Sequence, residues 1–227
     1  ASGPAARAAR RAGAAGFTLM ELMVVVVLVA ILALLAIPAM RRSRDDKVAF
    51  DHARLTQLLI HRARTRSAGR GGAHLIAMDA GALRGRVLLF EALDPATTPP
   101  TPASSCKTLN QWQQVLAWLP GVVGNQARIV DYLDFNTGGV NDDADIRAEI
   151  RVNNVTTAAA VMCVTPGGTT FVGVGADIGS AITDMQGQLP FSGVLEVRLS
   201  RHTGGAPIGI TRRVIAAGMA SPRIKSE

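Results

Sequence analysis

A single carboxylate interrupts the longest apolar stretch of the chain. Glu21 is the only charged residue in residues 17–40, which otherwise form an apolar run of 24 residues. A carboxylate at the centre of a membrane helix costs roughly 2.5–3.5 kcal/mol, and less near the end of the helix, and such residues usually have a function and a partner. Either Glu21 lies at the interface and reaches water, or another molecule supplies a cation against it.

The apolar run is long enough to cross a membrane. As a helix, residues 17–40 would span about 36 Å at 1.5 Å per residue, against a hydrocarbon core of about 30 Å. Three arginines within residues 7–11 favour a cytoplasmic N-terminus, but three more within residues 41–44 favour the opposite orientation. Charge alone therefore leaves the orientation open. A secretory signal fits poorly, because no small-x-small cleavage site follows the run.

The N-terminal residues resemble the start of a type IV pilin or pseudopilin. The likeness rests on a basic leader ending in Gly16, then Phe17, Glu21, the unbroken apolar run and Pro38. In that family a membrane-embedded aspartic peptidase cuts after the glycine, the new N-terminal residue is N-methylated, and the glutamate is used in filament assembly. The resemblance implies cleavage between Gly16 and Phe17, with residues 1–16 as the leader, and assembly through Phe17, Glu21 and Pro38.

The same resemblance implies how Glu21 acts and which partners the chain has. Cleavage creates an α-amino group at Phe17, and the ammonium of one subunit placed against Glu21 of another in low dielectric forms a strong ion pair. The implied partners are other pilins or pseudopilins in a helical filament, the prepilin peptidase and an inner-membrane assembly platform. The chain would begin in the inner membrane with its globular domain in the periplasm, then enter a pilus or pseudopilus at the cell surface or in the periplasm.

The remainder of the chain predicts an α+β domain, with one long helix packed on an antiparallel sheet. The helix is expected to kink at Pro38 and to continue to about Arg66, with glycines at 69, 71 and 72 ending it. Residues 17–40 would be its transmembrane half and residues 41–68 its amphipathic half, leaving 69–227 as the globular domain. The predicted packing face follows a helical spacing and consists of Val48, His52, Leu55 and Leu59.

Short apolar runs bounded by Gly, Pro and Asn predict the strands. A second helix is expected between Lys107 and Leu119, and a Pro- and Thr-rich loop over residues 94–104. Gly173, Gly175 and Gly179 miss the dinucleotide-binding spacing and indicate a loop. The strands are expected at residues 74–78, 86–90, 129–133, 146–152, 161–164, 171–174, 194–200 and 211–216.

Two cysteines, Cys106 and Cys163, are present. In the periplasm, where disulfides form and persist, they could bridge. The bridge would close a loop of about 57 residues and contribute roughly 4 kcal/mol in the chain-entropy model. The alternative is two separate thiols.

An acidic segment at residues 134–145 follows the pattern of a calcium loop. Oxygen donors suit a hard cation, and the spacing places Asp, Asn and Gly where such a loop needs them. A solvated acidic turn before a strand explains the same residues. The candidate ligand positions are Asp134, Asn136, Gly138, Val140, Asp142 and Asp145.

Positive charge gathers in two places around an acidic middle. The net charge is +7 for residues 41–86, −6 for 87–199 and +4 for 200–227. The basic side chains could bind a phosphate backbone, as minor pilins that take up DNA do. The alternatives are a solvated helix end and tail, or ion pairs between subunits with the acidic middle. The residues concerned are Arg62, Arg64, Arg66, Arg70, Arg212, Arg213, Arg223 and Lys225.

The functional prediction is a structural subunit and not an enzyme, because no nucleophile elbow, phosphate loop or Cys-x-x-Cys is present. No cofactor is expected apart from the candidate calcium. Residues 61–70 and 211–224 resemble the helix-to-strand junction and the closing strands of H-type pseudopilins and their minor-pilin relatives. That likeness favours a minor pilin of a type IV pilus. The alternatives are a pseudopilin of a type II secretion system and a DNA-binding minor pilin.

Overall fold

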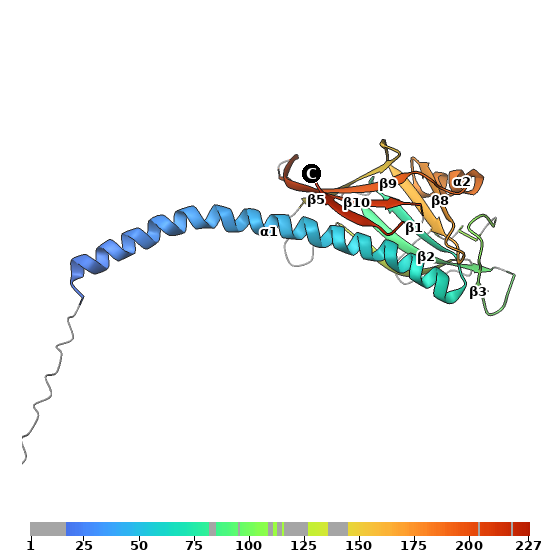
Figure 1. The fold of residues 1–227 in the computed structure, drawn as a ribbon, viewed down its shortest axis with the longest axis horizontal. Coiled ribbons are helices and arrows are strands. Elements are labelled where there is room, and N and C mark those ends of the chain that lie inside the picture. The colour runs from blue at the N-terminus through green and yellow to red at the C-terminus, as the bar shows by residue number, and fades with distance from the viewer. Residues whose placement is uncertain are drawn as a thin grey trace, which may run out of the picture. The chain divides into compact units, whose positions relative to one another are not determined.

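The computed structural model divides into two units, Ala1–Arg42 and Ser43–Glu227. One helix, α1 (Leu19–Arg70), contributes residues to both units (Figure 1). The structure describes residues 17–81, 85–94, 96–108, 111–112, 115, 127–135, 145–203, 205–218 and 220–227.

In the first unit, the described side chains of residues 17–34 are all exposed. Among the described residues, no helix is both long enough and apolar enough to cross a bilayer. The backbone of α1 remains helical through Pro38. The kink expected at this proline stays a prediction.

In the second unit, α1 packs through a face of small residues. The predicted face is wrong in part: Leu59 is buried, but Leu55 is 46% exposed and lies at the edge of the contact. Small side chains let a helix backbone approach a sheet closely, and a pattern that weights large apolar residues misses them. The most buried positions on this face are Ala49, Ala53, Thr56, Ile60, Ala63 and Ser67.

The helix ends later than expected, at Arg70 in place of Arg66. Gly71 ends it in the left-handed region, with φ at +69°, and its N–H donates to the Ser67 carbonyl at 3.1 Å. A glycine adopts this conformation without the steric cost that a side chain would add, so the stop itself was predictable.

A six-stranded antiparallel sheet forms the centre of the second unit. The strand order is β3-β2-β1-β7-β8, and β4 also pairs with β2. Every residue of β7 is buried, as expected for a strand covered on both faces. The strands are β1 (His74–Asp79), β2 (Arg86–Asp94), β3 (Thr101–Pro102), β4 (Ala127–Asp134), β7 (Ala159–Val164) and β8 (Thr170–Gly175).

A second antiparallel sheet of five strands has the order β11-β10-β9-β5-β6. All eight strands expected from the sequence are present in the two sheets, and the α+β prediction is confirmed. The short strands β3, β6 and β11 are not among the eight expected runs. The members of this sheet are β5 (Asp145–Val152), β6 (Val155–Thr157), β9 (Val194–Thr203), β10 (Ala206–Ala217) and β11 (Arg223–Ser226).

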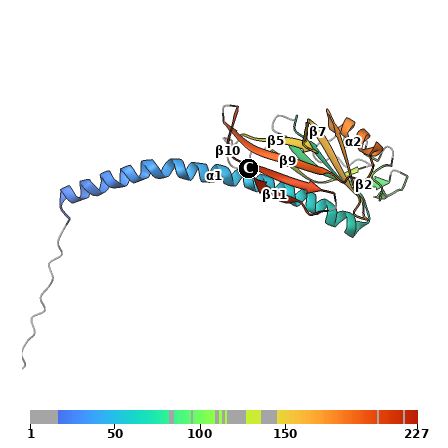
Figure 2. The ribbon, with the colours of Figure 1, turned by 45° about the horizontal axis from the view of Figure 1, so that its top comes forward.

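Two hydrophobic cores hold the second unit together. One lies between α1 and both sheets, and includes Ile60, Met162 and Leu199. The other lies on the opposite face of the six-stranded sheet and is covered by Trp112 and the helix α2 (Ile178–Gly187). The six-stranded sheet is therefore buried on both faces (Figures 1 and 2).

Helix α2 was not predicted, and it changes the interpretation of the glycines before it. Gly173 and Gly175 lie in β8, and not in the expected loop, because α2 rests directly on this strand. A Cβ at Gly173 would come within 2.1 Å of the Ala181 carbonyl oxygen. The expected helix at 107–119 falls mostly outside the described residues, although Gln111 and Trp112 lie in a turn.

The end of the chain is tied to α1 by side chains of the helix. Arg64 donates to the carbonyl oxygens of Gly218, at 2.7 Å, and of Ala220. Gln57 donates to the Pro222 carbonyl at 2.8 Å. Strand β11, which follows, lies beside α1 in both views (Figures 1 and 2).

Candidate functional site

The N-terminal turn of α1 presents Glu21 in a defined position. Thr18 caps the helix: its Oγ1 accepts from the Glu21 N–H at 3.2 Å, and its carbonyl accepts from the Leu22 N–H at 3.2 Å. Glu21 is therefore the third residue of the helix, where the macrodipole favours a negative charge. The role of Thr18 was missed, although Thr-x-x-Glu is a capping-box pattern that signals it.

The carboxylate of Glu21 is available to a partner. Its side chain is exposed, and no cation pairs with it within the described part of the chain. Large apolar side chains surround it: Phe17 is 79% exposed, and Leu19, Met20 and Leu22 are exposed as well. A contiguous exposed apolar surface of this kind marks an interaction site with protein or membrane.

Comparison with known families supports the resemblance of the N-terminal residues to pilins and pseudopilins. Residues 11–37 match the model of the prokaryotic N-terminal methylation motif. The chain therefore carries the N-terminal motif of type IV pilins and pseudopilins. The match covers Gly16, Phe17, Glu21 and α1 as far as Ile37, and it leaves the subgroup open. No curated protein and no solved structure matches the chain.

The processing, location and assembly described next are properties of the family that carries this motif. Pilins and pseudopilins are processed by a prepilin peptidase, anchored in the inner membrane and assembled with other subunits, and they are generally structural proteins without enzymatic activity. Of the predicted processing residues, Gly16 lies outside the described residues, and Phe17 immediately precedes the capping residue Thr18.

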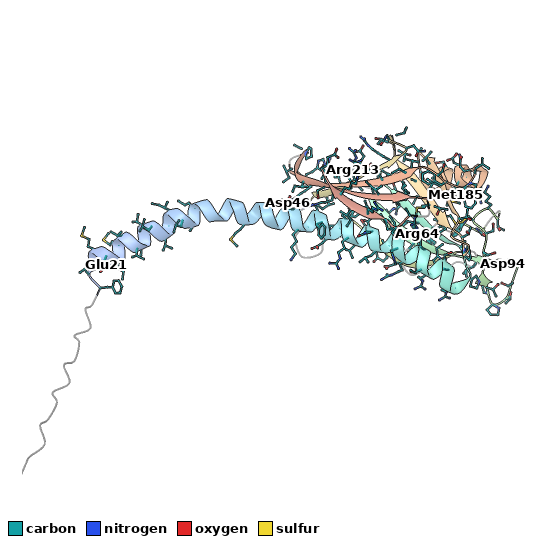
Figure 3. The ribbon with its side chains drawn as sticks, in the orientation of Figure 1. Glu21, Asp46, Arg64, Asp94, Met185 and Arg213 are labelled. Carbon is teal, nitrogen blue, oxygen red and sulfur yellow. A yellow bond between two sulfur atoms is a disulfide. The ribbon has the colours of Figure 1, made fainter. Side chains whose placement is uncertain are left out.

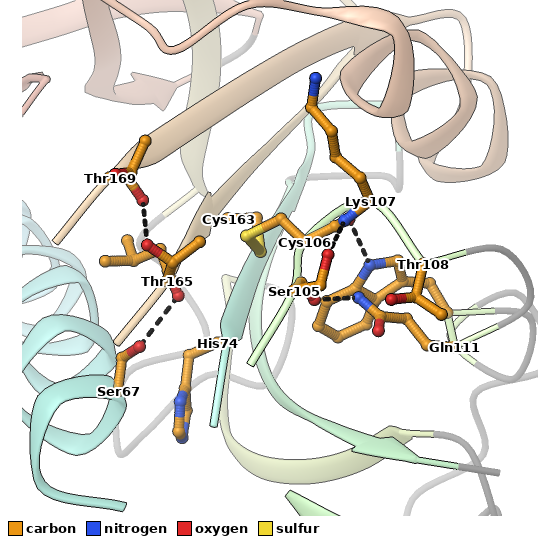
Figure 4. The surroundings of a disulfide bond; sticks show 12 residues. Ser67, His74, Ser105, Cys106, Lys107, Thr108, Gln111, Cys163, Thr165 and Thr169 are labelled. Atoms are coloured by element: carbon orange, nitrogen blue, oxygen red, sulfur yellow. Dashed lines mark hydrogen bonds between the residues drawn. A yellow bond between two sulfur atoms is a disulfide. The ribbon is translucent and has the colours of Figure 1, made fainter. Parts of the chain in front are cut away.

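The predicted disulfide forms in the second unit. Cys106 and Cys163 are bridged, with their Cα atoms 5.9 Å apart and 57 positions between them in sequence. The bridge attaches the segment around Ser105 and Lys107 to β7 in the second core (Figure 4). Both half-cystines are buried, and Trp112 Nε1 donates to the Cys106 carbonyl at 3.1 Å. The bridge is therefore part of the core.

The predicted basic residues at the end of α1 have partners within the domain. Arg62 pairs with Asp131 on β4, and Arg70 Nε lies 2.7 Å from an oxygen of the buried Glu91. Arg64 binds the carbonyl oxygens at the end of the chain, as described above. Each of these contacts fixes α1 to a strand or to the C-terminal segment. These contacts lie within one chain, so the ion pairing between subunits that the sequence suggested for this part of the basic set stays a prediction.

The basic residues of β10 are also engaged. Arg213 binds the Glu196 carboxylate through two nitrogens, at 2.5 and 2.8 Å, and Arg198 Nε binds the same group at 2.6 Å. The Arg212 guanidinium lies 5.5 Å from the ring centroid of Phe50. Arg223 and Lys225 are exposed on β11. DNA binding by the basic set stays a prediction.

Glu196 is the most buried of the carboxylates on this sheet. Burial by itself would raise the pKa of Glu196, but the hydrogen bonds and charges of Arg213 and Arg198 outweigh it and hold the pKa below the ordinary value. The group is therefore ionised at neutral pH. It links β9 to β10 on the face of the five-stranded sheet that points away from α1.

A second buried polar group lies where α1 ends. His74 on β1 is buried, with Nδ1 3.0 Å from the Gly72 carbonyl, and it faces Glu91 across the β1–β2 pair. Burial lowers the pKa of His74; Glu91 opposes this shift, and Arg66 and Arg70 add to it. This histidine is neutral in the folded protein at neutral pH.

The calcium prediction concerns residues at the ends of two strands. Asp134 ends β4 and Asp145 begins β5, in different sheets. Asn136, Gly138, Val140 and Asp142 lie outside the described residues. Among the residues that are described, no group of three or more metal-binding side chains occurs. Calcium binding stays a prediction.

Proposed function

We propose that the chain is a minor subunit of a type IV pilus, cut between Gly16 and Phe17 and assembled through the first half of α1. The observation that carries the proposal is the exposed Glu21 carboxylate on a helix whose neighbouring side chains are exposed and apolar. In an assembled bundle of such helices this carboxylate needs a cation, and the ammonium created at Phe17 of a neighbouring subunit supplies one.

The apolar run at residues 17–40 serves as the membrane anchor before assembly. The methylation motif supports this role, and so does the hydropathy of the run, in which Glu21 is the only charge. The N-terminus lies in the cytoplasm and the domain that begins at Ser43 lies in the periplasm, where the Cys106–Cys163 bridge is stable. The chain then leaves the membrane as part of a filament.

The minor-pilin assignment depends on the resemblance of residues 61–70 and 211–224 to H-type pseudopilins and minor pilins. A pseudopilin of a type II secretion system would use the same cleavage and the same helix. The two are distinguished by where the filament is found: sheared surface filaments contain a pilin, whereas a pseudopilin stays with the cell envelope.

The test compares Glu21→Ala with Asp51→Ala, which removes an exposed carboxylate from the same helix outside the apolar run. Mass spectrometry of the mature protein should find an N-terminus at methylated Phe17 in both variants. The Glu21 variant should be lost from sheared filaments, and the Asp51 variant should be retained. Wild-type incorporation of Glu21→Ala, or a mature protein that still begins at Ala1, would refute the proposal.

A further inference from the structure

The hairpin of β9 and β10 is latched to α1 by one acidic side chain. Asp46 Oδ1 accepts from the Ile210 N–H at 3.2 Å, and Asp46 lies beside the end of the hairpin (Figure 3). The preceding Gly209 has φ at +71°, and a Cβ there would approach Asp46 Oδ1 to 2.8 Å. The latch therefore depends on a glycine and leaves the Asp46 carboxylate turned to the β10 backbone.

Apolar side chains remain uncovered around this latch. Ile208 and Ile210 are 37% and 38% exposed, and Phe50, one turn after Asp46, is 39% exposed. Arg212 lies over the Phe50 ring, and Lys47 is exposed on the adjacent position of α1. We call these five residues the hairpin patch: Lys47, Phe50, Ile208, Ile210 and Arg212.

The hairpin patch follows the apolar run closely along the chain. Lys47 comes seven residues after Met40, the last residue of the run. Residues 41–54 hold five bases against three acids, and one of the acids, Asp46, is engaged by the hairpin backbone.

This chemistry fits an anionic membrane surface. Basic residues next to a membrane anchor are attracted to anionic headgroups by about 1 kcal/mol each. Aromatic and aliphatic side chains beside them gain by entering the boundary between headgroups and acyl chains. A neutral or basic partner would leave the cations of the patch without a counter-charge.

We propose that the hairpin patch binds the anionic phospholipid surface around the anchor while the subunit waits in the membrane. Ile208, Ile210 and Phe50 enter the interface, and Lys47 and Arg212 bind lipid phosphates. The inference rests on the anchoring role proposed above for residues 17–40. Lipid contact then holds the domain against the bilayer until the subunit is extracted into a filament.

The test places the full chain, one copy per disc, in lipid nanodiscs that contain phosphatidylglycerol and phospholipids brominated on the acyl chains. Ile208→Trp puts a fluorophore in the patch, and Val155→Trp is the matched control, because Val155 is 69% exposed on β6 at the opposite edge of the same sheet. The parent protein gives the background from Trp112 and Trp118.

Bromine quenching should be severalfold stronger for Ile208→Trp than for Val155→Trp, and should fall when zwitterionic lipid replaces phosphatidylglycerol. Adding Lys47→Gln should lower the ratio of lipid-bound to detached patch about fivefold, the equivalent of about 1 kcal/mol for one lost cation. Lys225→Gln, which removes an exposed lysine from β11, should leave the ratio unchanged.

Equal quenching of the two tryptophans would overturn the inference. So would quenching that appears only when several copies share a disc, because the patch would then be covered by a second copy of the chain. If the chain does not enter the discs at all, the anchoring proposal itself fails. Co-elution of protein and lipid before any fluorescence measurement separates that failure from the others.

Discussion

Removing the Cys106–Cys163 bridge should destabilise the domain strongly. The two half-cystines are 57 positions apart, and in the chain-entropy model a loop of this length corresponds to about 4 kcal/mol. For a domain of this size each kcal/mol shifts the unfolding midpoint by about 2–4 °C, so the expected drop is about 8–16 °C. The change to make is the double substitution Cys106→Ala/Cys163→Ala, which avoids leaving a lone thiol.

The loss of structure should begin in the segment before Trp112, because the bridge attaches this segment to the second core. Trp112 is nearly fully buried and donates to the Cys106 carbonyl. When the bridge is absent, this segment keeps only weaker contacts, among them Lys107 Nζ to the Gln188 carbonyl at 2.5 Å. Trp112 should therefore become accessible to solvent at temperatures where both sheets are still folded.

Two measurements on the full chain in detergent test this reasoning. Circular dichroism gives the global midpoint, and acrylamide quenching in a Trp118→Phe background follows Trp112 alone. Wild-type protein treated with reductant under denaturing conditions and refolded without oxidant is the control for the substitutions. A midpoint within about 2 °C of the oxidised protein, equivalent to less than about 1 kcal/mol, would refute the claim that the bridge supports the core.

Three further outcomes follow from the contacts described above. Glu196→Gln should cost about 1–3 kcal/mol of unfolding free energy, since it weakens three hydrogen bonds from two guanidinium groups. Because the pKa of Glu196 is lower in the folded protein than in the unfolded chain, this group stabilises the fold at pH values above its unfolded pKa, and that stability is lost as the pH falls through the folded pKa. Urea titrations at several pH values would detect both effects. The lowered pKa of His74 means that stability should fall as pH drops below about 6.5, and His74→Gln should flatten this part of the curve. Gly173→Ala should cost about 1–3 kcal/mol because its Cβ meets the backbone of α2, whereas Gly167→Ala, which has open space, should change the midpoint little; equal effects would contradict the close packing of α2 on β8.

Periodicity and turn residues were enough to predict the strands of this chain. Each expected run is bounded by Gly, Pro or Asn, and each corresponds to a strand, because a half-buried or buried strand needs a short apolar run and a break on either side. The end of α1 was placed four residues early, since the chain continues as helix through Gly69 to the cap at Gly71.

The errors have a common physical cause in small residues. Ala49, Ala53 and Ala63 carry the helix–sheet contact, and a pattern based on large apolar residues selected Leu55, which is largely exposed. The glycines of β8 were interpreted as a loop, although their role is to let α2 approach the strand backbone. Residues whose role is to be small, so that another element can approach closely, are hard to recognise in a single sequence.

The candidate site was predictable because its residues are adjacent in the chain. Gly16, Phe17 and Glu21 lie within one short motif, and the family match covers the same stretch. The latch between Asp46 and Ile210 was not predictable, since it joins residues 164 positions apart and depends on the bulge in β10. Local chemistry can be found in the sequence, whereas distant pairings require the folded chain.

The hydrogen bonds from Arg64 and Gln57 to the C-terminal segment impose an order on biosynthesis. They join positions 154–165 residues apart, so α1, which is synthesised before the strands, can complete its docking only after nearly the whole chain has been made. Until then its inner face is open to chaperones and proteases. A nascent chain truncated before residue 218 would lack these closing contacts, so an incomplete chain differs from a finished one in how firmly α1 is held.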